Sequence, residues 1–330
     1  MKIRIGIIGA LGHIHTVVDG IRENPEIVCT AIAKGSEEDD LTQLKAELAQ
    51  VGCFPKFYED YHELLQQEKL DAVAVDARFD LHSSITMEAF RYVDYVYCEK
   101  PLATTMEDFQ KLCAVRKPYQ ILWSMATTRY DPWFYTAYCQ VKAGMIGKIR
   151  MMNARKSYRL GTRPDFYRSR STYGGTISWV GIHGMDWMRL VCDEPLTSVD
   201  AYASCQDNPQ GSFENSAVCM FRFGNEVFGT LSIDFLRPDS MQVHDDDCFR
   251  IAGTKGILQV EKKQVYLLTE PNQNPQQLTL IQPPHGIFAD FVRAVQGAKD
   301  GLLNTGISLE TTRMSLLATQ SADQNRRIVL

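Results

Sequence analysis

Short apolar runs alternate with amphipathic stretches along residues 1–124 of the chain. Runs such as Ile3–Ile8 and Ile27–Ala33 have the length and composition of buried strands in a parallel sheet. The stretches between them, such as Thr16–Glu23 and Ser83–Tyr92, have the periodicity of helices. Strands and helices that alternate in this way predict a doubly wound parallel sheet.

The pattern changes after residue 124. A predicted helix over Pro132–Ala143 is followed by a strand and a second helix. Strands then succeed one another without helices between them, from Leu196–Cys205 to Val265–Leu268, which favours an antiparallel or mixed sheet. We therefore predict two α/β domains, residues 1–124 and residues 125–330, and a length of 330 residues also suggests two domains of about 150 residues each.

Composition narrows the class of protein. A net charge of −5 argues against nucleic acid as a main partner, and a hydrophobic content of 45% is ordinary for a globular chain. The nine cysteines include no C-x-x-C pair, so we expect neither a structural zinc nor another metal site. The chain shows no export signal and no apolar run long enough to span a bilayer, so we expect a cytoplasmic protein without a membrane partner.

The first strand runs into a glycine-containing turn, Gly9-Ala10-Leu11-Gly12-His13-Ile14-His15, before the first helix. Strand, glycine-rich turn and helix are the context of a dinucleotide-binding site, because glycine lets the backbone approach a pyrophosphate and a helix amino terminus favours anions. The pattern G-x-G-x-x-G requires glycine where Leu11 stands. A plain strand-to-helix turn therefore remains the alternative.

The end of the second strand bears on the choice of cofactor. An acidic residue there holds the ribose of NAD, whereas a basic residue suits the phosphate of NADP. Lys34 and Ser36 follow this strand and favour NADP slightly, although Glu37 and Glu38 oppose it. An exposed loop lysine is the alternative interpretation of Lys34.

The strand Tyr95–Cys98 ends in Glu99-Lys100-Pro101. Pro101 restricts the backbone of Lys100, and ligands of open α/β sheets bind at the carboxyl ends of strands. An ammonium group held there can donate a proton or orient a hydroxyl. A surface lysine before a helix-starting proline is the alternative.

Several motifs together, in this order and spacing, make the chain similar to the Gfo/Idh/MocA family of sugar-type oxidoreductases over essentially its whole length. They are Cys98-Glu99-Lys100-Pro101-Leu102, Arg129-Tyr130-Asp131-Pro132, Gly144-Met145-Ile146-Gly147-Lys148, Gly174-Gly175 with Gly181-x-His183-x-x-Asp186, Gly253-Thr254-Lys255-Gly256 and the closing helix Ser308–Ile328.

The resemblance implies a Rossmann-type dinucleotide-binding domain and a substrate-binding α/β domain, whose large open sheet, mostly antiparallel, builds homodimers or homotetramers. It implies NAD or NADP at the Gly9–Gly12 turn and a cis peptide bond before Pro101. The implied cofactor-binding residues are Gly9, Leu11, Gly12, His13, Ile14, Lys34, Ala77, Arg78, His82, Glu99, Lys100 and Arg129. The implied substrate-binding residues are Lys100, Arg163, Tyr167, Trp179 and His183.

The resemblance makes Lys100 and His183 the catalytic residues. Oxidation of a secondary alcohol needs a base for the hydroxyl proton while hydride leaves for the nicotinamide, and histidine titrates in the right range. Lys100 would stabilise the developing alkoxide. We thus predict an NAD(P)-dependent oxidoreductase that acts on a hydroxyl of a sugar, polyol or related small molecule, neutral or anionic. A core histidine on a helix is the alternative interpretation of His183.

Three departures from the family pattern support an alternative function. Trp179 stands where the family has aspartate, Leu11 replaces a glycine, and Ala77-Arg78-Phe79 replaces Thr-Pro-Asn after Asp76. A non-catalytic dinucleotide- or sugar-binding regulatory relative is therefore the second hypothesis. Asp186 lies one helical turn after His183, where it would orient the imidazole, bind substrate or serve the structure.

A basic cluster precedes Gly174, in a stretch that by resemblance borders the substrate cleft. Arginine suits carboxylates and phosphates, so an acidic sugar or sugar phosphate is one hypothesis, and a solvated loop or an oligomer contact is the other. The acidic run His244–Asp247 is interpreted as a loop that caps the cleft or pairs with the basic cluster, rather than as a metal site. The cluster consists of Arg155, Lys156, Arg159, Arg163, Arg168 and Arg170.

Overall fold

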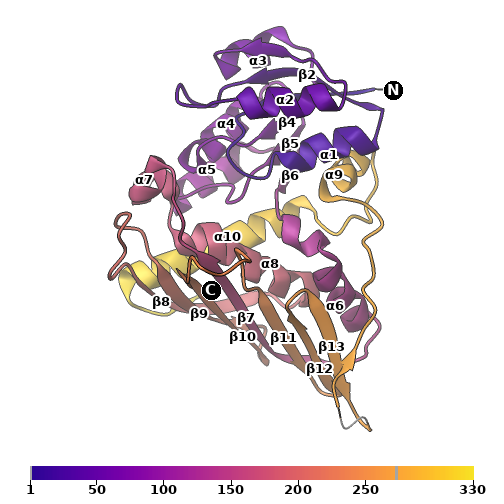
Figure 1. Ribbon diagram of the computed structural model, residues 1–330, viewed down its shortest axis with the longest axis vertical. Helices are drawn as coiled ribbons and strands as arrows, with labels where there is room; N and C mark the ends of the chain where they lie inside the picture. Colours follow the sequence, from indigo (N-terminus) through magenta and orange to yellow (C-terminus); the bar gives the residue numbers. More distant parts are fainter. Residues whose placement is uncertain (1, 272–273) are drawn as a thin grey trace. The chain divides into compact units, whose positions relative to one another are not determined.

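The computed structural model in Figure 1 describes residues 2–271 and 274–330 of the chain. The chain forms two compact units, each made of two segments. The first unit ends at Thr127 and regains His285–Glu310, and the second consists of Thr128–Pro284 and Thr311–Leu330. The functional assignment of residues 1–124 and 125–330 as cofactor and substrate domains stays a prediction.

The first unit contains a six-stranded sheet in the order β3-β2-β1-β4-β5-β6, and every strand pair in it is parallel. The predicted doubly wound sheet is therefore confirmed. The strand order reverses beside β1, so the carboxyl ends of β1 and β4 flank the place where such sheets bind ligands. The strands are β1 (Ile3–Ile8), β2 (Ile27–Ala33), β3 (Lys56–Tyr58), β4 (Ala72–Val75), β5 (Tyr95–Cys98) and β6 (Ile121–Ser124).

Helices connect these strands, and the two predicted over Thr16–Glu23 and Ser83–Tyr92 are present as α1 and α4, each beginning one residue earlier. Thr105 caps α5 by accepting a hydrogen bond from the Asp108 backbone N–H at 3.1 Å. Helix α9 packs against α1 (Figure 1), at a place where a Cβ on Gly20 would lie 2.5 Å from the Phe288 ring. The helices are α1 (His15–Glu23), α2 (Thr42–Gln50), α3 (Tyr61–Gln67), η1 (Phe79–Leu81), α4 (His82–Ala89), α5 (Met106–Val115) and α9 (Ile287–Val295).

The second unit contains a nine-stranded sheet in the order β14-β13-β12-β11-β7-β10-β9-β8-β15. Among the described residues, only β7 and β10 pair in parallel, so the predicted open, mostly antiparallel sheet is confirmed. The strands are β7 (Ile149–Arg159), β8 (Leu196–Ser204), β9 (Ser216–Phe223), β10 (Val227–Arg237), β11 (Cys248–Gly253), β12 (Gly256–Glu261), β13 (Gln264–Thr269), β14 (Gln276–Gln277) and β15 (Ile328–Val329).

The two faces of this sheet differ. Along β9 the side chains alternate between buried and exposed positions, and the exposed ones include Val218 and Met220. Phe228 of β10 is exposed as well. The opposite face carries α8 and α6 (Figure 1). In the part of the chain that the structure describes, one face of the sheet with exposed apolar side chains is therefore uncovered.

The helix predicted from Gly174-Gly175 onwards is present as a π-helical turn, η4, followed by α8. A Cβ on Gly181 or Gly184 would lie 2.5 Å from a β10 side chain, so these glycines let the helix approach the sheet. No helix in the described part of the chain is long and apolar enough to cross a bilayer. The remaining helices are η2 (Thr127–Tyr130), α6 (Pro132–Lys142), η3 (Asp165–Arg168), α7 (Arg170–Tyr173), η4 (Ile177–Gly181), α8 (Ile182–Val191) and α10 (Thr305–Gln324).

Candidate functional site

The turn after β1 lies tightly against the residues that follow β4. Gly9 has a φ of 79°, and a Cβ on it would lie 2.6 Å from the Asp76 carbonyl oxygen and 2.7 Å from the Ala77 nitrogen. A Cβ on Gly12 would lie 2.8 Å from Asp76 Oδ1. Only glycine fits these two positions. Leu11 is tolerated in place of a third glycine because its side chain is 41% exposed while its N–H donates to the Asp76 carbonyl at 2.9 Å.

Two fully buried carboxylates, Asp76 and Glu99, lie behind this turn. Asp76 accepts a hydrogen bond from the Ile14 backbone N–H at 2.8 Å, and burial, together with the charge of Glu99, raises its pKa well above the ordinary value. Glu99 lies 2.9 Å from His13 Nδ1 and 3.8 Å from Lys100 Nζ. Although burial acts to raise it, His13 and Lys100 hold the pKa of Glu99 below its ordinary value.

Lys100 is 2% exposed at the carboxyl end of β5, and its peptide bond to Pro101 is cis, as predicted. His82, fully buried, joins this segment to the loop after β4. Its Nδ1 lies 2.8 Å from the Pro101 carbonyl oxygen and its Nε2 lies 2.9 Å from that of Ala77. Each ring nitrogen of His82 thus lies within hydrogen-bond distance of a backbone carbonyl oxygen. The side chain therefore links the loop after β4 to the loop after β5.

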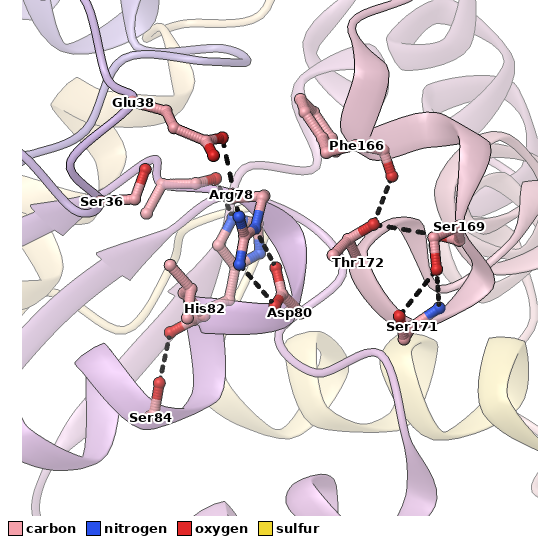
Figure 2. Close-up of polar contacts among 12 residues, drawn as sticks. Ser36, Glu38, Arg78, Asp80, His82, Ser84, Phe166, Ser169, Ser171 and Thr172 are labelled. Carbon is pink, nitrogen blue, oxygen red and sulfur yellow. Dashed lines mark hydrogen bonds and ion pairs between the residues drawn. The ribbon is translucent and has the colours of Figure 1, made fainter.

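Cationic side chains in the predicted cofactor region are paired with acids. Figure 2 shows Arg78 between Glu38 and Asp80. Its Nε and Nη2 donate to the two carboxylate oxygens of Asp80 at 2.8 and 3.1 Å, and its Nη1 lies 3.8 Å from Glu38. Lys34 Nζ lies 2.8 Å from a Glu59 oxygen. These contacts neutralise the two cations within the unit.

The segment after β2 is organised by Asp39, which is buried. The hydroxyl of Ser36 donates to Asp39 Oδ1 at 2.8 Å, and the Gly35 N–H donates to Oδ2 at 2.8 Å. A cavity of about 520 Å³ lies beside this segment, lined by Lys34, Ser36, Glu59 and neighbouring residues. Carboxylates therefore hold the groups that would have to bind a phosphate there.

In the second unit, His183 is 2% exposed in the first turn of α8. Its Nδ1 lies 3.3 Å from the hydroxyl oxygen of Thr128, which also accepts a hydrogen bond from Trp187 Nε1 at 2.9 Å. In the tautomer whose Nδ1 donates to Thr128, Nε2 carries the lone pair that a general base requires. Thr128 and Trp187 thus orient the imidazole.

Asp186, one turn after His183, is bound by Arg129 rather than by the histidine. Arg129 Nε and Nη2 donate to its two oxygens at 2.9 and 2.5 Å, and both residues are essentially fully buried. Burial raises the pKa of Asp186 although Arg129 and a hydrogen bond from Thr311 act to lower it. Asp186 was expected to orient the imidazole, bind substrate or serve the structure. Its direct contact with Arg129 supports the structural role.

Three predicted substrate-binding residues form one cluster in the second unit. Tyr167 and Trp179 are buried and meet edge to face, with ring centroids 6.3 Å apart. The Arg163 guanidinium lies 5.8 Å from the Tyr167 ring centroid and 4.8 Å from that of Phe235. The cluster is aromatic with one cation at its border, and Trp179 packs within it.

The acidic run after His244 pairs with the basic cluster, which is one of the two roles expected for it. Asp246 lies 2.9 Å from Arg155, and Asp247 lies 2.6 Å from Lys156. Lys156 is buried, and these contacts occupy the carboxylates that a cation would need.

The predicted site residues follow the carboxyl ends of parallel strands in the first unit, whereas Arg129, Arg163, Tyr167, Trp179 and His183 lie in the second. Their roles stay predictions. Sequence reasoning missed Thr128 and the engagement of Asp76 with the turn. Thr128 directly precedes the motif Arg129-Tyr130-Asp131-Pro132, and Asp76 ends a buried apolar strand, where a charge is unusual. Those two signals were available.

Comparisons with known proteins place the chain in a family. A family model described as "Oxidoreductase family, NAD-binding Rossmann fold" matches residues 3–125, and the GFO/IDH/MocA C-terminal domain matches residues 134–259. A solved structure from Thermotoga maritima, provisionally named an oxidoreductase, is 37% identical with a TM-score of 0.94 and covers 99% of this chain and 100% of its own.

Curated relatives are more distant. Myo-inositol 2-dehydrogenase of Thermotoga maritima is 27% identical over 69% of this chain and 67% of its own length, and inositol 2-dehydrogenase of Salmonella typhimurium is 26% identical over 60% and 55%. A levoglucosan dehydrogenase solved with NADH and L-sorbose shares the fold, at 18% identity and a TM-score of 0.80 over 100% and 99% of the chains. The chain therefore belongs to the Gfo/Idh/MocA family, as its motifs predicted, and is an NAD-binding oxidoreductase of that family.

Proposed function

We propose that the protein is a dehydrogenase that transfers a hydride between a nicotinamide cofactor and a hydroxyl-bearing carbon of a sugar, polyol or related small molecule. The observation that carries the proposal is Lys100, a buried ammonium at the carboxyl end of β5 beside the Gly9–Gly12 turn. The inositol dehydrogenases among the relatives support a polyol-like substrate.

The turn fits a dinucleotide, because Gly9 and Gly12 leave the space that a backbone-to-pyrophosphate approach needs. When bound, the nicotinamide supplies the hydride acceptor or donor. Lys34 and Ser36 suggested a slight preference for NADP. In the structure Glu59 and Asp39 engage them, so a 2′-phosphate would have to displace carboxylates. We therefore propose that NAD binds more tightly than NADP.

The two predicted catalytic residues have complementary tasks in this proposal. In the oxidative direction, His183 Nε2 accepts the proton of the substrate hydroxyl as the carbon loses hydride. The Lys100 ammonium can stabilise the negative charge of a developing alkoxide. Thr128 keeps the imidazole oriented through Nδ1. The product is the corresponding ketone, and the reverse reaction returns the proton from His183.

We also propose a homodimer or homotetramer, joined through the uncovered face of the nine-stranded sheet. Val218, Met220 and Phe228 support this, since contiguous exposed apolar side chains mark protein contact surfaces. Light scattering of the wild type and of a Val218→Asp variant tests it. A monomeric wild type would contradict the proposal.

Calorimetric titration with NAD and NADP, followed by measurement of NADH formation with myo-inositol and a panel of sugars, tests the function. Lys100→Met and His183→Gln should each lower kcat/KM by about 10²-fold or more while NAD still binds, since each removes transition-state stabilisation or proton transfer. Unchanged turnover in either variant would remove that residue from the mechanism.

The second candidate is a non-catalytic relative that binds a dinucleotide or a sugar. Trp179 in place of the family aspartate favours it, because its buried ring packs against Tyr167 and offers no proton relay. Tight NAD binding without turnover of any polyol or sugar in the panel would make this candidate the better one.

A further inference from the structure

Two arginines of the basic cluster differ from the others. Arg155, Lys156, Arg168 and Arg170 each form an ion pair with an aspartate or glutamate. Arg159 and Arg163 form none among residues 2–271 and 274–330; their guanidinium groups donate to backbone carbonyl oxygens. The Nε atom of each is buried without a hydrogen-bond partner. The guanidinium groups of Arg159 and Arg163 can therefore still donate hydrogen bonds to an anion.

Arg163 is held in place without any carboxylate. Its guanidinium lies against the rings of Phe235 and Tyr167, and its Nη2 donates to the Arg159 carbonyl oxygen at 3.0 Å. Its backbone N–H donates to Gln210 Oε1 at 3.1 Å. Aromatic faces and backbone contacts thus fix the side chain before a ligand arrives, which lowers the entropic cost of binding.

His244 adds a third basic group to this place. Its ring stacks on Tyr158 with centroids 4.6 Å apart, and its carbonyl oxygen accepts a hydrogen bond from the Arg159 N–H at 3.0 Å. Burial lowers the pKa of His244, and the charges of Arg163 and Arg159 lower it further. The imidazole therefore lies within the field of both guanidinium groups, and an anion bound there would relieve their mutual repulsion.

The cluster is connected to the proposed catalytic helix inside the second unit. Arg163 contacts Tyr167, Tyr167 contacts Trp179, and Trp179 lies four residues before His183, which is one helical turn. This chain of contacts leads from the Arg163 guanidinium to the helix that carries His183 within the second unit.

We propose that Arg159, Arg163 and His244 form a binding site for an oxyanion of the substrate, a carboxylate or a phosphate, so that the substrate class is an acidic sugar or a sugar phosphate. This inference rests on the proposed dehydrogenase function. The planar fork of Arg163 suits both anions, and neutral sugars lack the group that would use it.

Calorimetry on the NADH-loaded protein tests the site with three probes at equal ionic strength: D-glucuronate, D-glucose 6-phosphate and D-glucose. At least one charged probe should bind about tenfold or more tightly than D-glucose, a difference of about 1.4 kcal/mol. The arm that shows this difference identifies carboxylate or phosphate. Equal affinity for all three probes would overturn the proposal.

Variants separate the site from general charge. Arg163→Gln should bring the affinities for the charged and neutral probes to within about threefold of each other. Arg163→Lys should keep part of the difference, since it retains the charge but not the fork. Arg168→Gln is the matched control, because it removes the same charge from the same loop at a residue already paired with Asp165. An unchanged preference in Arg163→Gln, or its loss in Arg168→Gln, would contradict the site.

Two further readouts keep this inference distinguishable from the dehydrogenase proposal. Unaltered thermal unfolding and NAD binding of Arg163→Gln would show that the variant is folded; if it unfolds, Arg159→Gln serves in its place and carries the same expectation. Preferential binding of a charged probe without NAD reduction would leave the anion site standing and overturn the dehydrogenase. Turnover of neutral polyols without any charged-probe preference would do the reverse.

Discussion

The two units of the protein treat buried carboxylates in opposite ways. In the second unit, Asp186 is neutralised by two hydrogen bonds from the buried guanidinium of Arg129. In the first unit, Asp76 and Glu99 are both fully buried behind the Gly9–Gly12 turn, and the charge of Glu99 raises the pKa of Asp76. Arg129 and Asp186 thus form a closed pair, in which a cation neutralises the carboxylate. Asp76 is instead an open carboxyl, because the neighbouring charge of Glu99 raises its pKa.

The two arrangements suit different roles: the ion pair supports the structure, whereas the protonation of Asp76 depends on the charges around it. The pair of Arg129 and Asp186 holds the helix that carries His183, and its charge state has no reason to change during a reaction. Asp76 accepts a hydrogen bond from the Ile14 backbone N–H just before α1, and its raised pKa favours the neutral form of the carboxyl. Perturbed carboxyls of this second kind are typical of functional sites.

Breaking the closed pair should have the largest effect on folding. Arg129→Met leaves Asp186 as an unpaired buried charge and should lower the free energy of unfolding by about 3–5 kcal/mol. The double variant Arg129→Met with Asp186→Leu should recover most of that loss, because no uncompensated charge remains. Urea denaturation of the wild type and the two variants measures both quantities. A double variant as unstable as the single one would show that packing, rather than charge, dominates.

Adding one methyl group to each region is the next test. Gly9→Ala should lower the free energy of unfolding by about 2–4 kcal/mol, because alanine is strained at a φ of 79° and its Cβ would meet backbone at 2.6 Å. Gly184→Ala should cost less than about 1 kcal/mol, since its Cβ meets the end of the movable Leu231 side chain and alanine favours the helix. Thermal unfolding compares the two variants, and equal losses would contradict the contrast between backbone and side-chain contact.

The sequence was sufficient to predict the fold and the position of the glycine-containing turn after β1. Apolar runs predicted β1 and β2 at their observed bounds, because a strand that is buried on both faces is a continuous apolar run in the sequence. It was not sufficient for the pairing of charges. Arg129 and Asp186 are separated by 56 other residues, and nothing local indicates that a guanidinium and a carboxylate so far apart bind each other.

The same limit applies to residues whose partners come from elsewhere in the chain. Lys34 was predicted to hold a phosphate, and Glu59 lies 2.8 Å from it; His82 was predicted to contact the cofactor, and its two ring nitrogens lie beside backbone carbonyl oxygens. Both roles stay predictions. Residue type predicts what a side chain is able to bind. Tertiary structure decides whether that capacity is already used.

The pH dependence of the free energy of unfolding should reveal the raised pKa of Asp76, the open carboxyl. The pKa of Asp76 is raised, so the folded state binds its proton more tightly than the unfolded state, and stability decreases as the pH rises above the ordinary value of 3.8. The pKa of Glu99 is lowered, so its contribution is lost only as the pH falls below the ordinary value of 4.5. Above about pH 5, Asp76→Asn should remove a downward slope of up to about 1.4 kcal/mol per pH unit. Denaturation curves at several pH values measure the slope, and parallel curves for variant and wild type would contradict the assignment.

The smallest expected effect belongs to an exposed pair, which completes the comparison. Lys34 and Glu59 also neutralise each other, but Glu59 is 72% exposed, so solvent screens the interaction and its loss should leave the free energy of unfolding almost unchanged. Glu59→Gln should instead act on the cofactor. It releases the ammonium of Lys34 and should raise the affinity for NADP by about threefold to fivefold, while NAD, which lacks the phosphate, stays unaffected. Titration of both cofactors against wild type and variant decides the matter: an equal gain for NAD and NADP would mean that the variant merely makes the region less acidic, and no gain for either would separate Lys34 from the cofactor altogether.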